Sequence, residues 1–562
     1  MKGTRLLWAL LVIQLILVLC AQQGRVYLDD EVGTWRAAGG SFGAILTSFD
    51  EWQTQPGYFL LAKLCSLPLG VSEFALRLPA LVFGLLLTAA TYALVTSLVD
   101  RRAGILSAAL VGLHPFVVFY SQMARGYTMA MALVVVSLFC VQRLASGKGG
   151  IPTGLACTVA RAGSVYAHLG ACATIVAEVL LALCVAHGSA AEAKRRNLLR
   201  ALAWVGAGGL LAIALYGPLF SGMLAFRERW TGENRGGFSL GFLPLVARAY
   251  GGGSLLGTGL LVLLGLVGLG SLLAKQRERS TAMVLFLGSL AVLGFYWALD
   301  TAHYPWAFAR FLAPALPLLL ALAGIGLARG GQRLVARLGV GSMAGILALV
   351  FLVAYRDTAS VAFDPRDVAW PDVLEEIVAD GPRTLVLAPV RFHASEPYLE
   401  QLSGSGIRVI STDSLLAILA RGGLSELSRV PLTVLQDVVP CESLSSSFSV
   451  STFGTTTRLD WDNEGDSPES LLRALRDLSL KQVEFLKPRE GVPIAGRWVF
   501  WRIHKNHEHT SDATLSHGAA EALLAVTSGL LGSATEAEEA FRRAQELRDA
   551  VPVPGDVVSQ WQ

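Results

Sequence analysis

Long apolar segments alternate with short charged ones through the first 355 residues, whereas residues 356–562 have the mixed pattern of a globular domain. An α-helix needs about 20 mostly apolar residues to cross the roughly 30 Å hydrocarbon core of a bilayer. The pattern therefore predicts about eleven transmembrane helices, near residues 6–21, 78–98, 103–120, 126–142, 151–168, 170–187, 201–221, 254–273, 281–299, 311–327 and 338–355. The predicted fold class is a multi-pass α-helical membrane protein with a C-terminal α/β domain.

The composition supports this division of the chain. Of its 562 residues, 53% are hydrophobic and only 16% are charged, which is unusual for a soluble protein. A formal net charge of +3 is nearly balanced and indicates no nucleic-acid partner. Among the seven cysteines, only Cys441 lies beyond residue 356, so no disulfide framework is expected in that part.

Basic residues predict the orientation, because they concentrate in cytoplasmic loops. A cytoplasmic N-terminus places the basic groups near residues 2–5, 101–102, 143–148, 194–200, 275–279 and 329–337 on the cytoplasmic side. An odd number of spans then puts the first long loop, 22–77, and the C-terminal part outside. We expect a protein of the cytoplasmic (inner) membrane with an external or periplasmic C-terminal domain. A cleaved signal peptide is the alternative reading of the first segment.

The external parts have their own expected elements. In the first loop, residues 42–49 and 58–69 have the spacing of amphipathic helices that lie in the membrane interface. Between residues 356 and 511, strands are expected at 384–388, 409–411 and 432–435, and helices at 394–403 and 413–421. This alternation predicts a small α/β domain. The Ser/Thr-rich segment 442–456 is expected to be loop, and residues 512–562 a helical segment with two helices around Gly532.

Three carboxylates follow the first span directly, at Asp29, Asp30 and Glu31. A carboxylate at this boundary can act as a general base on a substrate whose other half stays in the bilayer. The alternative is the solvated start of a loop. Arg125, at the external end of the third span, could bind a lipid phosphate through its planar fork of donors. An arginine that only reaches toward lipid headgroups is the alternative there.

Arg161 and Glu178 are the two charged residues deep within predicted spans. If the chain turns at residues 169–170, each lies about 12 Å from the turn, at 1.5 Å per residue. Equal depth on adjacent antiparallel helices predicts a structural ion pair. A role in transport or proton relay is the alternative, since transporters place polar groups near the bilayer midplane.

Six motifs occur in an order and spacing that resemble one family. They are Leu28 to Glu31, Gln55-Pro56-Gly57-Tyr58, Glu73-x-x-x-Arg77-Leu78-Pro79, Tyr120-Ser121-Gln122-x-Ala124-Arg125-x-Tyr127, Tyr166-x-His168 and Arg310-Phe311-x-x-Pro314-x-x-Pro317. This set resembles bacterial glycosyltransferase family 39, whose members are GT-C-fold membrane enzymes similar to protein O-mannosyltransferases and lipid A aminoarabinose transferases.

The resemblance implies transfer of a sugar from a polyprenyl-phosphate carrier to a hydroxyl of a protein or glycolipid acceptor on the external face. The family's catalytic Asp-Glu pair falls on Asp30 and Glu31, with Asp30 as the general base. A single displacement inverts the anomeric centre and needs neither a covalent intermediate nor a nucleotide cofactor, and dependence on a divalent metal ion stays open. Contacts with substrate or phosphate are expected from Arg125, Tyr127, Arg310, His168, His303 and Gln55.

Three positions depart from the family's pattern. Gln55-Pro56-Gly57 replaces a His-Pro-Pro-like segment, Met123 stands where an acidic residue is common, and Asp29 adds a third carboxylate. These departures affect the expected identity of the acceptor more than the expected class of reaction.

Two other functions stay open at this point. A transporter or flippase of lipid-linked sugars would depend on Arg161 and Glu178, and a non-catalytic scaffold would use the external domain to bind an envelope partner. A histidine-rich tract at His504, His507 and His509 could bind a metal ion. An exposed linker is the simpler interpretation of that tract.

Overall fold

The computed structural model describes residues 2–22, 27, 29–49, 54–187, 191–225, 246–247, 250–251, 255–276, 278–301, 309–338, 370–387, 397–399, 402, 404–421, 427, 431–436, 449–453, 456–461, 468–486, 521–528 and 530–550. The chain divides into two compact units. The first contains Met1–Gln23 and Gly33–Asp364, and the second contains Gly24–Val32 with most of the chain after residue 365. Each unit is described by itself.

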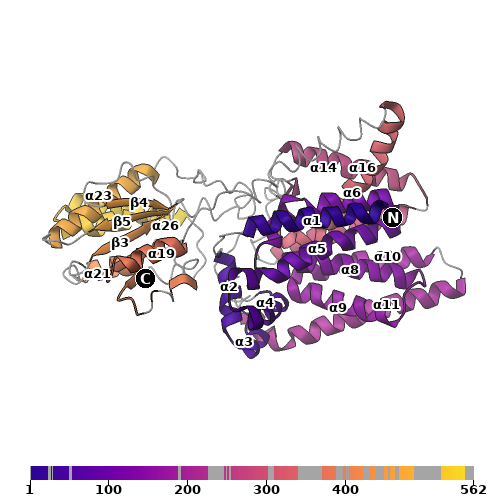
Figure 1. The fold of residues 1–562 in the computed structure, drawn as a ribbon, viewed down its shortest axis with the longest axis horizontal. Helices are drawn as coiled ribbons and strands as arrows, with labels where there is room; N and C mark the ends of the chain where they lie inside the picture. Colours follow the sequence, from indigo (N-terminus) through magenta and orange to yellow (C-terminus); the bar gives the residue numbers. More distant parts are fainter. Residues whose placement is uncertain are drawn as a thin grey trace. The chain divides into compact units, whose positions relative to one another are not determined.

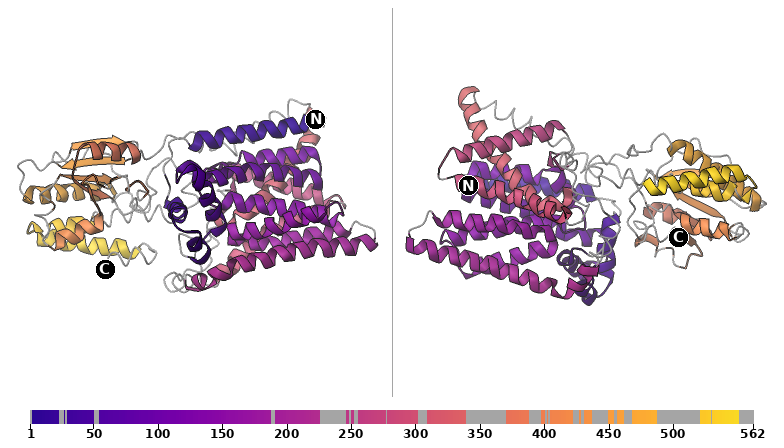
Figure 2. Two further views of the ribbon diagram at one scale, coloured as in Figure 1. Left: turned by 60° about the horizontal axis from the view of Figure 1, so that its bottom comes forward. Right: turned by 180° about the vertical axis from the view of Figure 1, so that it is seen from behind.

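The first unit is a bundle of long helices that run side by side (Figures 1 and 2). Its helices are α1 (Lys2–Gln22), α5 (Glu73–Leu98), α6 (Arg101–Gly112), α7 (Pro115–Ser121), α8 (Tyr127–Ala145), α9 (Ile151–Ala167), α10 (Ile175–His187), α11 (Ala191–Tyr216), α14 (Leu255–Leu273), α15 (Arg279–Thr301) and α16 (Leu316–Leu338). Short 3-10 turns, η1 (Leu169–Thr174), η2 (Gly217–Leu219) and η3 (Ala309–Ala315), interrupt the bundle.

These helices confirm the prediction of a multi-pass membrane protein. Among the described residues, seven helices are long and apolar enough to cross a bilayer, and α6 with α7, bent by 60°, make an eighth if they form one span. The predicted first span is a shorter apolar helix, Thr4–Cys20, and the fifth is α9, with 17 residues. The predicted span at 338–355 lies almost wholly outside the described residues.

The surface of the bundle is apolar, as contact with lipid requires. Leu210 and Ile213 on α11 and Leu256 on α14 are each 70% exposed, although no apolar side chain of this size gains by facing water. Inside the bundle, α14 and α16 approach closely at Gly268 and Gly326. A Cβ atom on Gly268 would overlap the carbonyl oxygen of Leu322, and one on Gly326 would overlap that of Leu264. Small residues permit such contacts between backbones of membrane helices.

Three shorter helices lie at one end of the bundle (Figures 1 and 2). They are α2 (Asp29–Gly39), α3 (Phe42–Thr47) and α4 (Pro56–Leu69). The helices expected at 42–49 and 58–69 are therefore present as α3 and α4. Ser41 caps α3 by accepting the amide hydrogen of Ala44, and Pro56 starts α4, where a missing amide hydrogen costs nothing.

The second unit contains a five-stranded sheet in the order β2-β1-β3-β5-β4. The strands are β1 (Thr384–Leu387), β2 (Arg408–Ser411), β3 (Leu432–Gln436), β4 (Ser449–Phe453) and β5 (Thr456–Trp461), and the helices are α19 (Trp370–Ala379), α21 (Thr412–Ala420), α23 (Pro468–Leu486) and α26 (Ala534–Ala550). β1 pairs in parallel with β2 and β3, whereas β5 pairs antiparallel with β3 and β4.

Three expected strands and the helix expected at 413–421 are confirmed. The prediction of loop throughout 442–456 is wrong, because β4 lies within it and β5 begins at its end. A polar strand at a sheet edge gains its stability from pairing with its neighbour, which composition does not reveal. The helix expected at 394–403 lies mostly outside the described residues.

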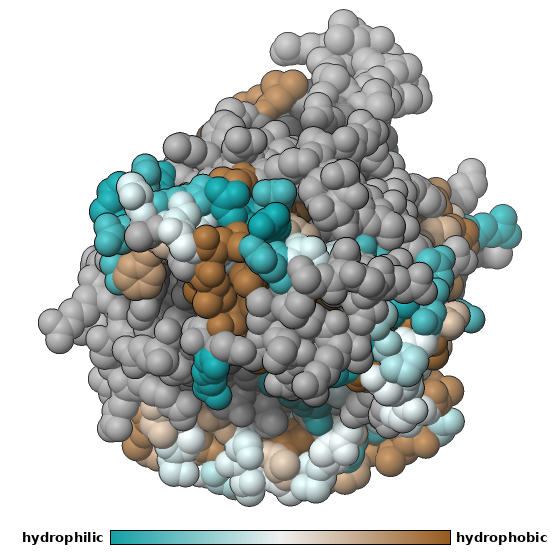
Figure 3. Space-filling model, turned by 90° about the vertical axis from the view of Figure 1, so that its left-hand side faces the viewer, coloured by the Kyte–Doolittle hydropathy of each residue, from teal (hydrophilic) through white to brown (hydrophobic). Residues whose placement is uncertain are grey.

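The core of the second unit packs helices against the sheet. Val386, Ile410, Leu432 and Trp461 from the strands meet Leu475 of α23. Arg476 of α23 donates hydrogen bonds of 2.8–2.9 Å to Glu536 of α26. These bonds join α26, the C-terminal helix, to the α/β part. In the space-filling view of Figure 3, hydrophilic and hydrophobic described residues both reach the surface.

The close crossing of α14 and α16 gives a first prediction. Gly268→Ala should destabilise the protein by about 1–3 kcal/mol, because the added methyl group displaces α16. Gly270→Ala on the same helix is the control, since a Cβ atom there meets nothing within 4 Å. Thermal unfolding of the detergent-purified protein measures both, and equal midpoints for the two variants would contradict the close packing.

Candidate functional site

The acidic cluster forms the start of a helix. Asp29 and Asp30 occupy the first turn of α2, followed by Glu31, which is completely buried. Negative charge is favoured at this end of a helix by the helix dipole. Of the three carboxylates, Glu31 is therefore buried within a helix.

Two hydrogen-bonding side chains hold α2 in place. Thr34, one turn after Glu31, donates from Oγ1 to the carbonyl of Ala124 at 2.6 Å. Lys63 of α4, 9% exposed, donates from Nζ to the carbonyl of Ala38 at 2.8 Å and also to that of Gly40. The C-terminal end of α2 therefore has its unpaired carbonyls satisfied by a buried cation, as helix termini require.

The segment Gln122–Gly126, called here the 122–126 break, separates α7 from α8. Its backbone is held by Gln55 at the start of α4, whose Oε1 accepts the amide hydrogen of Gly126 at 2.8 Å. Arg125 is 5% exposed, and its guanidinium lies over the ring of Phe59 at 5.6 Å. Gln55, expected to contact substrate, thus binds the backbone beside Arg125 through its side-chain oxygen.

The end of α9 lies against the same break. A Cβ atom on Gly126 would come within 2.7 Å of the carbonyl oxygen of Ala167. The next residue, His168, places its ring 5.5 Å from that of Tyr127 and 5.9 Å from that of Phe311. Arg310 lies over the Phe311 ring at 5.4 Å. Tyr127, His168 and Arg310 are thus brought together, whereas His303 lies outside the described residues.

Two buried side chains near this centre have unpaired atoms. Neither the Nε2 nor the Oε1 atom of Gln122, which is wholly buried, has a hydrogen-bond partner among the described residues. The Nδ1 atom of His168 also has none there. Buried polar groups are almost always paired, so such atoms point to a ligand or water. Gln122 was not among the residues expected to contact substrate, although it lies three residues before Arg125 in the same motif.

The predicted contact between Arg161 and Glu178 is confirmed. Nε of Arg161 lies 3.5 Å from Oε2 of Glu178, and both side chains are almost completely buried. For metal binding, the described part of the chain contains no cluster of three or more His, Cys, Asp or Glu side chains. His504, His507 and His509 lie outside it.

No protein-family model matches the chain, and no curated protein matches its sequence. Among solved structures, it resembles ArnT from Cupriavidus metallidurans in the apo state, with 13% identity and a TM-score of 0.48 over 83% of this chain and 100% of that one. The structure of the same protein bound to undecaprenyl phosphate is 13% identical, with a TM-score of 0.48 over 80% of this chain and 97% of that one. The Archaeoglobus fulgidus oligosaccharyltransferase in complex with zinc and sulfate is 14% identical, with a TM-score of 0.46 over 76% of this chain and 67% of that one.

The bond from Gly126 to Gln55 gives a second prediction. Gln55→Met removes the acceptor and leaves a buried amide unpaired, which should cost about 1–3 kcal/mol. Amide hydrogen exchange across residues 122–127 should then be faster, whereas Gln55→Glu, which keeps an oxygen at this position, should preserve the slow exchange. Identical exchange in wild type and Gln55→Met would show that this bond does not hold the break.

Proposed function

We propose that this protein is a membrane glycosyltransferase that moves a sugar from a polyprenyl-phosphate carrier to an acceptor hydroxyl. The observation that carries the proposal is the convergence of Thr34, the start of α4 and the end of α9 on the 122–126 break. Arg125 lies in the break and His168 follows α9, and the base, Asp30, is assigned by the motif resemblance. A base, a cation and sugar-binding groups are the parts that this transfer needs.

In the proposed reaction, the acceptor oxygen attacks the anomeric carbon while Asp30 takes its proton, with Glu31 as the second carboxylate of the pair. The bond between that carbon and the phosphate oxygen breaks, and its electrons leave with the polyprenyl phosphate. A positioned general base accelerates such a step by about 10²–10⁴-fold. Because one displacement completes the transfer, the configuration at the anomeric carbon is inverted.

Arg125 binds the phosphate of the donor. A guanidinium can offer paired donors to phosphate oxygens, and burial strengthens its attraction to the charge that develops on the leaving group. Gln122 suits the sugar better than the phosphate. Its amide has both a donor and an acceptor unpaired, and hydroxyl groups can satisfy both, whereas the phosphodiester monoanion of the donor only accepts. Tyr127, His168, Arg310 and His303 complete the proposed donor site.

The proposed surroundings follow the distribution of basic residues. The N-terminus is cytoplasmic, and transfer occurs at the external face of the inner membrane, onto a protein or glycolipid. The transporter alternative required Arg161 and Glu178 to serve a moving substrate. Arg161 instead donates to the carbonyls of Ala171 and Cys172, which suits a fixed structural position.

Exchange of a single carboxylate tests the base. Asp30→Asn keeps the size of the side chain and removes the proton acceptor, so transfer should fall by about 10²–10⁴-fold. Asp29→Asn is the matched control and should keep most activity. Mass spectrometry of envelope proteins and glycolipids compares a deletion strain with strains carrying each variant. A glycan mass restored equally by wild type and Asp30→Asn contradicts the assignment.

The phosphate site is tested separately, by binding of undecaprenyl phosphate to purified protein. Arg125→Ala should weaken binding about tenfold or more, since a charge-assisted bond contributes about 1.5–3 kcal/mol. Arg143→Ala is the control: this arginine also lies over an aromatic ring, that of Phe139 at 5.9 Å, near the other end of α8. Unchanged affinity in Arg125→Ala rules out the phosphate role.

A further inference from the structure

The 3-10 turn η1 follows His168 directly and is held by one buried cation. We propose that Arg161 is a positioning residue, which fixes η1 and thereby the place of His168 in the donor site. This inference rests on the proposed function, because His168 matters only if the donor sugar binds there. It assigns to Arg161 a role beyond that of an ion-pair partner for Glu178.

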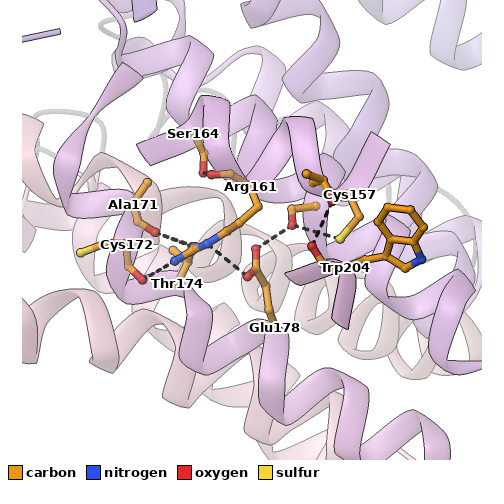
Figure 4. Close-up of polar contacts among 10 residues, drawn as sticks. Cys157, Arg161, Ser164, Ala171, Cys172, Thr174, Glu178 and Trp204 are labelled. Carbon is orange, nitrogen blue, oxygen red and sulfur yellow. Dashed lines mark hydrogen bonds and ion pairs between the residues drawn. The ribbon is translucent and has the colours of Figure 1, made fainter. Parts of the chain in front are cut away.

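Arg161 makes three hydrogen bonds to η1 (Figure 4). One terminal nitrogen donates to the carbonyl of Ala171 and to the hydroxyl of Thr174, both at 3.0 Å. The other donates to the carbonyl of Cys172 at 2.7 Å. The Thr174 hydroxyl in turn donates to the Ala171 carbonyl at 2.7 Å. A single planar guanidinium therefore satisfies two adjacent backbone carbonyls where the helical pattern is interrupted.

The contact with Glu178 is weaker by geometry. Its Nε to Oε2 distance of 3.5 Å is longer than any of the three bonds to η1. Neither atom has a hydrogen-bond partner in the described part of the chain. The other oxygen of Glu178 accepts a bond of 2.7 Å from Ser137 on α8. Glu178 thus balances the charge of Arg161, while the direction of the guanidinium is set by η1.

The backbone of His168 is linked to Arg161 on both sides. Its carbonyl accepts the amide hydrogen of Ala171 at 2.9 Å, and the Ala171 carbonyl is bound by Arg161. Its amide donates to the Ser164 carbonyl at 3.0 Å, and the Ser164 hydroxyl donates to the carbonyl of Arg161 at 2.8 Å. Movement of Arg161 therefore changes the turn from which the His168 ring projects.

Neighbouring helices leave little room for η1 to settle elsewhere. A Cβ atom on Gly170, within the turn, would overlap the hydroxyl of Tyr296 on α15. On α11, a Cβ atom on Gly208 would come within 2.7 Å of the Cβ atom of Arg161. The base of the Arg161 side chain therefore packs against α11, and the turn that its guanidinium binds packs against α15.

Two substitutions separate the bonds to η1 from the ion pair. Arg161→Lys keeps the charge beside Glu178 but has one nitrogen, which cannot bind both carbonyls and the Thr174 hydroxyl in this geometry. Glu178→Gln removes the ion pair and keeps Arg161. We expect Arg161→Lys to lower product formation by about 10²-fold, as misplacement by about 1 Å can do. Glu178→Gln leaves the buried charge of Arg161 unbalanced and should lower the amount of folded protein, but at equal protein level its product formation should stay close to wild type.

Coupling to His168 is the readout that a purely structural role would not produce. Product formation is measured in membranes of the deletion strain that carry each variant at equal protein level. His168→Ala lowers it, and adding Arg161→Lys to His168→Ala should cause no further loss. The proposal is overturned if the double variant loses as much product as the two single losses multiplied together. It is also overturned if Arg161→Lys is active while Glu178→Gln is inactive. If Arg161→Lys does not accumulate as folded protein, Arg161→Met with Glu178→Gln replaces it, because that pair leaves no unbalanced charge.

A separate measurement distinguishes failure of this inference from failure of the proposed function. Amide hydrogen exchange of residues 168–174 should be faster in Arg161→Lys than in wild type or Glu178→Gln, whatever the reaction is. If wild type forms no product but this exchange difference appears, the proposed function fails and Arg161 still fixes η1. Product from wild type with equal exchange in all three proteins refutes the inference alone.

Discussion

A bilayer gives the backbone no water to bond, so every amide and carbonyl within it needs a partner in the protein. The helices of the first unit meet this requirement by themselves, except where they break. At the bend between α6 and α7, Nδ1 of His114 accepts the amide hydrogen of Phe116 at 3.1 Å, and its Nε2 bonds the carbonyl of Tyr250 at 2.9 Å. Thr34 and Gln55 make hydrogen bonds to the backbone of the 122–126 break, and Arg161 makes hydrogen bonds to the backbone of η1.

The same breaks carry the residues proposed for chemistry. Because the chain leaves the helical path at the 122–126 break, Gln122 and Arg125 lie on a non-helical segment and not on a regular helix face. His168 is likewise placed where α9 ends. Side chains that repair broken backbone bonding thus also set the positions of the site residues. Residues outside the proposed chemistry, such as Lys63 and Arg161, consequently become part of what the site depends on.

Local patterns were sufficient for much of this architecture. Hydropathy located most of the spans, because the length of a membrane helix depends on nearby residues alone. Equal depth from one turn predicted the contact of Arg161 with Glu178. The bend at His114 was not predicted, since the apolar pattern of residues 103–120 continues through it, although Pro115 was a signal. The partner of Gln55 is 71 residues away, and strand β4 depends on pairing with β5. Such long-range contacts are not encoded in any local spacing.

The central claim is that the 122–126 break binds the phosphate of a polyprenyl-linked sugar. A cryo-electron microscopy structure of the Asp30→Asn variant with undecaprenyl phosphate in lipid nanodiscs tests this most directly. The account predicts the phosphate within hydrogen-bonding distance of the Arg125 guanidinium. A phosphate bound by other cations, with Arg125 still lying over Phe59 and away from it, would contradict the account.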